Sequence, residues 1–213
     1  MRIARLTDHR QLQDLYAFRY HIYVDELHWL DPTDSPEETT CNANALESGI
    51  LTDHFDATAL NYAAFDEEGE VVGSMQVVLD GSLGLPLEEC WTLDGFRTNR
   101  HVAELCRLAV ADDRRMTRLP LLLMKAGWQG ARRKGVDHVL VDAFVGEDHG
   151  AHANRLYERL GFEPLGSPCP DVRYCVENPM VVLAIECVAG EEALSPHLRG
   201  FFQSSDSMID HGE

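Results

Sequence analysis

The sequence predicts an α/β (α+β) fold in which helices flank a single mixed β-sheet. Its second half alternates strand, helix, strand, helix and strand, whereas its first half has the pattern of a meander of short strands. With 213 residues and 45% hydrophobic content, the chain can form one sizeable core but not two independent ones. We therefore expect a single domain over residues 1–190, followed by a polar tail of low order over 191–213.

The first half begins with a short strand, because MRIARL alternates apolar and polar residues, and Asp8 can then cap a helix. Residues 31–50 are polar and lack periodicity, so we expect a long irregular loop. Such a loop is either a binding lid or a linker. Segments 57–65 and 71–79 have the pattern of strands, joined by a hairpin turn in which Gly69 supplies a positive φ.

The second half continues with longer periodic elements. It contributes, in order, a strand over 101–111, a helix over 119–134, a strand over 136–145, a helix over 149–160 and a strand over 181–187. Gly161 ends the last helix, since the left-handed conformation of a helix C-cap costs glycine least.

The cysteines and histidines indicate no metal site. Six cysteines are scattered without a CxxC pair, so neither a disulfide framework nor a zinc site is predicted. Cys106 lies in an apolar strand with no histidine near it in sequence, and we expect it to be inert rather than a nucleophile. For His149 and His152, three residues apart, capping of a helix is favoured over a metal site. With no secretory signal and no apolar run of membrane-spanning length, we expect a cytoplasmic protein.

The formal net charge of −18 argues against a nucleic-acid partner, because phosphate backbones are held by clustered cations. Cations nevertheless crowd one segment. They are Arg107, Arg114, Arg115, Arg118, Lys125, Arg132, Arg133 and Lys134. A local basic patch on an acidic protein suits one anionic ligand, such as a cofactor phosphate or an acidic carrier protein, although a solvated helix face fits the charges equally well.

Two motifs in the second half carry a family resemblance. ANRLYERLGF, residues 153–162, resembles the signature that closes the acyl-CoA site of the GNAT acyltransferase superfamily. ELCRLAVADDRR, residues 104–115, resembles that superfamily's central cofactor-binding strand and the start of its pyrophosphate loop. Because both motifs occur in the expected order, the resemblance implies a GNAT-like fold.

The resemblance also implies where an acyl donor binds. A phosphopantetheine thioester, carried by coenzyme A or by acyl carrier protein, is expected along Leu108, Ala109 and Val110 and beside Asn154 of the later helix. The candidate residues of the pyrophosphate loop are Arg114, Arg115, Thr117 and Arg118. GNAT loops usually contain spaced glycines whose backbone N–H groups phosphate can approach, whereas residues 114–120 contain none.

A catalytic pair follows from the chemistry of such a site. An amine that attacks a thioester must lose a proton, and the departing thiolate must gain one. Glu104 is the candidate base, and the resemblance makes Tyr157 the candidate donor to the thiolate. A structural ion pair of Glu104 with Arg107 and a core role for Tyr157 are the alternatives. Strand alternation sends Glu104 and Arg107 to opposite faces, so a shared site requires a bulge between them.

FRYHIYVDELHW, DHFD and ELCRL resemble the spaced pattern of acyl-homoserine-lactone synthases, although Gln76 stands where those enzymes usually have arginine. Long-chain N-acyl amino acid synthases are similar to the lactone synthases in fold and acyl donor. The resemblance implies a substrate-binding set of Arg19, Trp29, Asp53, Asp56 and Arg107. Arg19 suits a carboxylate and the aspartates suit an amine, but a loop cap is an equally good role for the aspartates, and Arg107 could face the donor phosphate.

We therefore expect an N-acyltransferase that moves an acyl group from acyl carrier protein or acyl-CoA to the amine of a small metabolite, such as an amino acid. One alternative is an acetyltransferase that uses acetyl-CoA and a small polar amine. A non-catalytic module that binds an acyl ligand or a partner is the other.

Overall fold

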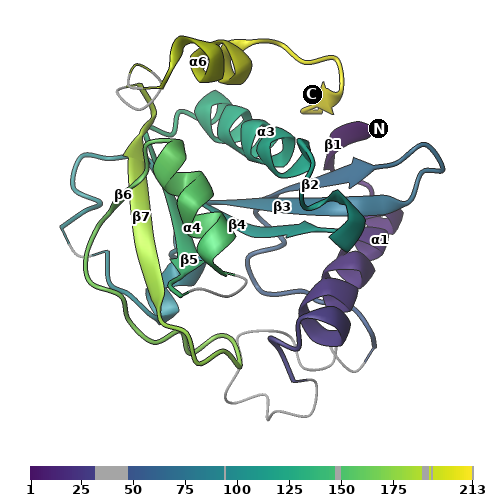
Figure 1. The fold of residues 1–213 in the computed structure, drawn as a ribbon, viewed down its shortest axis with the longest axis horizontal. Coiled ribbons are helices and arrows are strands. Elements are labelled where there is room, and N and C mark those ends of the chain that lie inside the picture. The colour runs from purple at the N-terminus through teal and green to yellow at the C-terminus, as the bar shows by residue number, and fades with distance from the viewer. Residues whose placement is uncertain (32–47, 94, 147–149, 189–191, 193, 213) are drawn as a thin grey trace.

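The computed structural model describes residues 1–31, 48–93, 95–146, 150–188, 192 and 194–212, which build one mixed sheet with helices on both faces (Figure 1). The strands are β1 (Arg2–Leu6), β2 (Leu60–Phe65), β3 (Val71–Leu79), β4 (Val102–Val110), β5 (His138–Phe144), β6 (Glu163–Pro164), β7 (Met180–Glu186) and β8 (Ile209–Asp210). Their order across the sheet is β6-β7-β5-β4-β3-β2-β1-β8. Strands β1 to β4 form an antiparallel meander, and β5 then runs parallel to β4. The predicted fold class is confirmed.

Four α-helices and three short helical turns surround this sheet in the described part of the chain. The α-helices are α1 (His9–Tyr20), α3 (Leu119–Arg133), α4 (Gly150–Arg159) and α6 (Pro196–Gln203). Short turns are η1 (His21–Glu26, π-helical), η2 (Pro86–Glu89) and η3 (Asp112–Arg114). Asp8 caps α1 as predicted, with its Oδ1 accepting the N–H of Gln11 at 3.1 Å, and Gly161 follows α4 with a φ of +87°.

The two faces of the sheet carry different helices. Alternate residues of β2 show this, because Ala64 packs in the cluster that contains α3 and α4, while Ala63 packs with Leu15 of α1. Helix α6 lies beyond α3, on the outside of the first face (Figure 1). Among the described residues, no helix combines the length and apolar character needed to cross a membrane.

The C-terminal segment corrects one prediction. Residues 191–213 were expected to be a polar tail of low order, yet the described part of this segment contains α6 and β8. Phe202 is 4% exposed in the main core, and β8 pairs parallel with β1. A few apolar side chains at helical spacing are enough to attach an otherwise polar segment to the core. Most of the predicted loop at 31–50 lies outside the described residues.

Candidate active site

Strands β4 and β5 meet at one end and separate at the other. In the described chain, the ladder between them covers Val102↔His138, Ala103↔Val139 and Glu104↔Leu140. β5 continues along β7 to Phe144, and β4 continues along β3 to Val110, so the two strands diverge beyond Glu104. Beyond Glu104 no β4–β5 ladder pair joins the described residues, so a ligand that extends between the strands could bind to backbone groups there.

A cavity of about 120 Å³ occupies this gap. Its walls come from both faces of the sheet, since Leu108 and Tyr157 belong to the face with α3 and α4, while Trp29, Phe55 and Phe144 belong to the other. Two reactants could therefore reach the gap from opposite faces of the sheet.

A β-bulge on β4 shapes the wall of the cavity. Ser74 pairs with Ala109 and Gln76 pairs with Cys106, so two residues of β4 oppose Met75 alone. Arg107, the first of the two, has a φ of +53°, which is an uncommon conformation for a residue with a side chain. A shared site requires a bulge, and this one, at Arg107 and Leu108, turns Arg107 to the same side of the sheet as Glu104.

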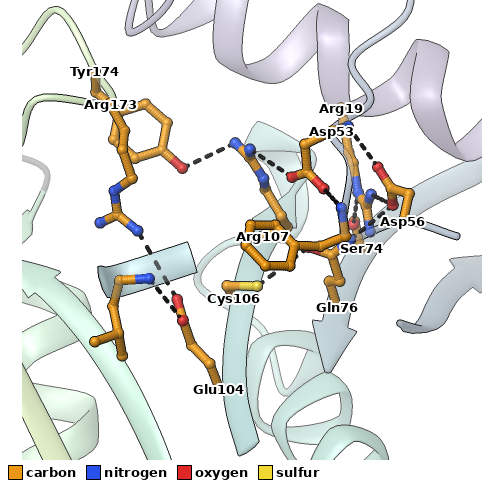
Figure 2. Close-up of polar contacts among 12 residues, drawn as sticks. Arg19, Asp53, Asp56, Ser74, Gln76, Glu104, Cys106, Arg107, Arg173 and Tyr174 are labelled. Atoms are coloured by element: carbon orange, nitrogen blue, oxygen red, sulfur yellow. Dashed lines mark hydrogen bonds and ion pairs between the residues drawn. The ribbon is translucent and has the colours of Figure 1, made fainter. Parts of the chain in front are cut away.

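Arg107 connects the cavity to a buried polar network (Figure 2). It donates to the Tyr174 hydroxyl at 2.9 Å and to Oδ2 of Asp53 at 3.0 Å. The carboxylate of Asp56 accepts from the Asp53 backbone N–H at 3.0 Å and from Arg19 at 2.8 Å. Burial opposes ionisation of Asp53, but the charge and hydrogen bond of Arg107 outweigh it and hold the pKa of Asp53 below its usual value.

Arg19 and Asp56 lie behind the cavity rather than in its wall. Arg19 is 1% exposed, and its guanidinium also donates to Ser74 Oγ at 2.9 Å and to Asn61 Oδ1 at 2.7 Å. Gln76 extends the network by donating to Asp56 at 2.7 Å. In the free protein, these contacts occupy the guanidinium that the sequence suggested for a substrate carboxylate.

Glu104 is fully buried at the point where β4 and β5 separate. Its Oε2 accepts the backbone N–H of Leu87 at 2.9 Å, whereas Oε1 has no hydrogen-bond partner among the described residues. Arg173 Nη1 lies 3.9 Å from Oε1. Burial, with the nearby charge of Asp142 second, raises the pKa of Glu104 to about 8. A carboxyl group with this pKa can act as a base near neutral pH.

Arg173 lies beside carboxyl groups from three parts of the chain. It donates to Asp171 at 2.7 and 2.9 Å and to Asp142 of β5, and it also faces Glu104. Burial opposes ionisation of Asp171, but the hydrogen bond and charge of Arg173 hold the pKa of Asp171 below its usual value. These residues therefore form a second buried ionic cluster beside the cavity.

Tyr157 of α4 is buried and lines the cavity from the face with α3 and α4. Burial, followed by the charge of Asp142, raises the pKa of Tyr157 well above its usual value. The phenol is therefore protonated at neutral pH and can donate a hydrogen bond. Tyr23, Trp29 and Tyr174 cover the opposite wall, with the Tyr23 and Tyr174 rings stacked at 6.0 Å.

The family follows from comparison with known proteins. A family model described as the N-acyl amino acid synthase FeeM matches residues 14–186. The chain belongs to the FeeM N-acyl amino acid synthase family. A search of curated proteins found no match. As a member of this family the protein is an N-acyltransferase that uses an acyl donor, and the predicted family is confirmed.

Solved structures agree on the fold of this FeeM-family protein. The structure of FeeM from uncultured soil microbes has a TM-score of 0.67 and 17% identity, and the match covers 93% of this chain and 96% of that one. BjaI, a CoA-dependent acyl-homoserine lactone synthase, has a TM-score of 0.65 and 16% identity, covering 99% and 93%. A GNAT acetyltransferase from Staphylococcus aureus has a TM-score of 0.54 and 12% identity, covering 87% and 98%. The predicted GNAT-like fold is confirmed.

The residues predicted to bind the donor in this FeeM-family protein lie along the diverging strand and on α4. Leu108 lines the cavity, and Ala109 and Val110 continue β4 beyond the bulge. Asn154 lies one helical turn before Tyr157, with its Oδ1 buried and without a hydrogen-bond partner in the described chain. An amide oxygen in this state suits a donor from a ligand, such as an amide N–H of a pantetheine arm.

The predicted pyrophosphate loop makes internal contacts. Arg115 donates to the Val110 carbonyl at 3.0 Å and pairs with Glu26, and Thr117 donates to the Arg114 carbonyl at 2.6 Å. Arg118 lies over the Phe201 ring at 5.9 Å. Arg114 pairs with its sequence neighbour Asp113, and both Arg114 and Arg118 are exposed, so either could meet an anion.

Sequence reasoning missed Asp142, Arg173 and Tyr174. Asp142 carried a signal, because it is a single charge within a buried apolar strand. Arg173 and Tyr174 lie in an irregular segment between prolines, where no periodicity indicates which side chains face inward. Cys106 agrees with its sequence assignment, since its thiol donates to Gln76 at 3.2 Å and burial raises its pKa well above the usual value.

Proposed function

We propose that this FeeM-family protein transfers an acyl group from a phosphopantetheine thioester to the amine of a small metabolite, an amino acid or a related compound. The donor is an acyl-CoA or acyl carrier protein, and the amine attacks it directly in a ternary complex. The observation that carries this proposal is the buried Glu104 carboxyl, with one unbonded oxygen, at the apex of the gap between β4 and β5.

The donor is expected on the face with α3 and α4. There the unladdered edge of β4 at Leu108 and Ala109 offers backbone groups to the pantetheine arm, and Asn154 offers an amide oxygen. The solved relatives BjaI and MesI are CoA-dependent, which supports coenzyme A as one form of the donor. The cavity of about 120 Å³ is smaller than the ligand pockets of about 300–1,000 Å³ that proteins commonly have, which favours a short acyl chain.

The acceptor is expected on the opposite face, beside Trp29, Tyr174 and Arg173. Glu104 takes a proton from the acceptor ammonium, directly or through a water molecule, and the free amine attacks the thioester carbonyl carbon. A backbone N–H near Leu108 and Ala109 stabilises the oxyanion. As the intermediate collapses, the C–S bond breaks, the nitrogen passes its remaining extra proton to the departing thiolate, and Tyr157 donates a hydrogen bond to that sulfur.

The test is an assay of purified protein with acyl-CoA donors from acetyl to palmitoyl, and with the matching acyl carrier proteins. Twenty free amino acids serve as acceptors, and products are identified by mass spectrometry. N-acyl product formation should fall by about 10²–10⁴-fold in Glu104→Gln, which keeps an oxygen for the Leu87 N–H. The exposed Glu186→Gln is the matched control.

Each outcome of this assay is informative. Product from acetyl-CoA alone would favour the acetyltransferase alternative, and product from longer chains would show that the cavity opens. If no donor gives an N-acyl amino acid, or if Glu104→Gln is as active as wild type, the proposal is wrong.

A further inference from the structure

Two ionic clusters lie beside the cavity. The first is the buried polar network of Arg107 and Arg19, and the second is the cluster around Arg173. They differ in charge balance. In the first, Asp53 is matched by Arg107 at 3.0 Å, and Asp56 is matched by Arg19 at 2.8 Å. Each carboxylate there has its own guanidinium, so this cluster is neutral as a whole. A cationic ligand would gain little from it, because both negative charges are already compensated.

The second cluster has more carboxyl groups than cations. Arg173 faces Asp142, Asp171 and Glu104, and it is a single positive charge. The other charge acting on Glu104 is that of Arg107 on the same strand, and the neighbouring Cys106 thiol is neutral. When Glu104 is ionised, the Arg173 cluster carries a local surplus of two negative charges. A buried surplus of this kind favours a cationic ligand.

Asp142 is the member of this cluster that a ligand can reach. Its side chain is 19% exposed and lines the cavity, whereas Asp171 is 1% exposed and Glu104 is fully buried. Glu104 pairs with Leu140 in the last ladder pair between β4 and β5, and Asp142 lies two residues beyond Leu140. The side chains of Glu104 and Asp142 therefore both lie at the start of the gap. An amine bound by Asp142 would therefore sit next to the unbonded oxygen of Glu104.

Aromatic rings around this position provide a second indication of a cation. Trp29 and Phe144 pack edge to face with ring centroids 5.0 Å apart, and Phe144 packs on Tyr174 at 6.0 Å. All three rings line the cavity together with Asp142. Rings attract ammonium groups over their faces, and a neighbouring carboxylate adds to that attraction.

We propose that Asp142 binds the protonated amine of the acceptor and holds it beside Glu104, an inference that rests on the proposed function. Arg173 is the positioning residue that holds the Asp142 carboxylate in the free protein. The bound ammonium stabilises ionised Glu104, passes it one proton and becomes the neutral nucleophile. Asp142 remains ionised throughout, so proton and charge balance.

The experiment compares Asp142→Asn with Asp142→Glu, and uses the exposed Asp14→Asn as control. The acceptor is the amino acid that wild type acylates fastest in the panel. Asp142→Asn should raise the KM for this amino acid at least tenfold with a much smaller change in kcat, and Asp142→Glu should restore part of the affinity. The rise of kcat/KM with pH should move to lower pH in Asp142→Asn, because the Asp142 charge raises the pKa of Glu104.

Two results would overturn the inference while leaving the proposed function intact. One is an active Asp142→Asn with unchanged KM and unchanged pH dependence. The other is a rise in KM for Asp53→Asn with none for Asp142→Asn, which would place the amine at Asp53. Binding without turnover is measured as the rise in melting temperature when each of the twenty amino acids is added. This rise should be lost in Asp142→Asn. If wild type binds amino acids but acylates none, the proposed function fails and the thermal shift still tests Asp142.

Discussion

Arg173 Nη1 lies 3.9 Å from Oε1 of Glu104, although the two residues belong to distant parts of the chain. The distance is too long for a hydrogen bond, so the guanidinium stabilises the carboxylate by its charge without fixing the proton-accepting oxygen. That oxygen has no hydrogen-bond partner among the described residues, although the carboxyl group itself is fully buried beside the cavity. Because burial and Asp142 outweigh Arg173, the pKa of Glu104 is raised to about 8.

The first prediction concerns the pH dependence of turnover. Glu104 must be ionised to accept a proton, so kcat/KM of the wild type should rise with pH up to about 8 and then level off. The acceptor amine also titrates, so the profile of Glu104→Gln serves as reference and should lack the step near pH 8. Stopped assays from pH 6 to 10 measure both profiles. A wild-type profile that is already flat at pH 6 would contradict the role of Glu104 as base.

The second prediction concerns stability. The pKa of Glu104 is raised from 4.5 to about 8 on folding, so the folded protein retains a proton that the unfolded chain loses between these values. The resulting stability is fully present below about pH 4.5 and is lost as pH rises through about 8. The glutamine in Glu104→Gln carries no charge at either pH. At pH 9 this variant should therefore melt several degrees higher than wild type, since each kcal/mol corresponds to about 2–4 °C. At pH 5 the two melting temperatures should be nearly equal. Equal differences at both pH values, measured by circular dichroism, would argue against a buried charge.

The third prediction concerns the leaving group. Tyr157→Phe keeps the ring that packs against Phe162 at 5.6 Å and removes the hydroxyl. Because hydrogen bonds to charged groups contribute about 1.5–3 kcal/mol, kcat should fall by about 10- to 100-fold with a coenzyme A thioester. The loss should shrink with an aryl thioester, whose thiolate needs less stabilisation. An equal loss with both donors would indicate a packing role for Tyr157.

The fourth prediction concerns the packing of α3 against the sheet. A Cβ added at Gly130 of α3 would lie 2.3 Å from the Tyr62 hydroxyl oxygen, and Tyr62 is held by His211 at 2.9 Å. We expect Gly130→Ala to destabilise the protein by about 1–3 kcal/mol in spite of the better helix propensity of alanine. Gly200→Ala in α6, where a Cβ meets nothing within 4 Å, should be neutral or stabilising. Urea unfolding compares the two, and equal stability of both variants would show that Tyr62 moves aside.

Periodic segments could be predicted closely because their pattern is local. The strand expected at 71–79 is β3, and the helix expected at 119–134 is α3, which ends one residue earlier. Two charged residues three apart on one strand face the same site only if the strand has a bulge, and β4 has one at Arg107 and Leu108. The order of the C-terminal segment could not be predicted, because α6 and β8 are stabilised by contacts with α3 and β1 rather than by their own composition.

The sequence by itself determined the alternation of elements and the family, and it pointed to Glu104 and Tyr157 as candidate catalytic residues. These depend on residue type and spacing along the chain, which can be read without knowing what lies opposite. The tertiary structure alone decided which carboxylates are matched by cations. Arg19 and Arg107 compensate Asp56 and Asp53, while Arg173 faces three carboxyl groups at once. Charge balance is a property of neighbours in space, and segments distant in sequence become neighbours when the sheet forms.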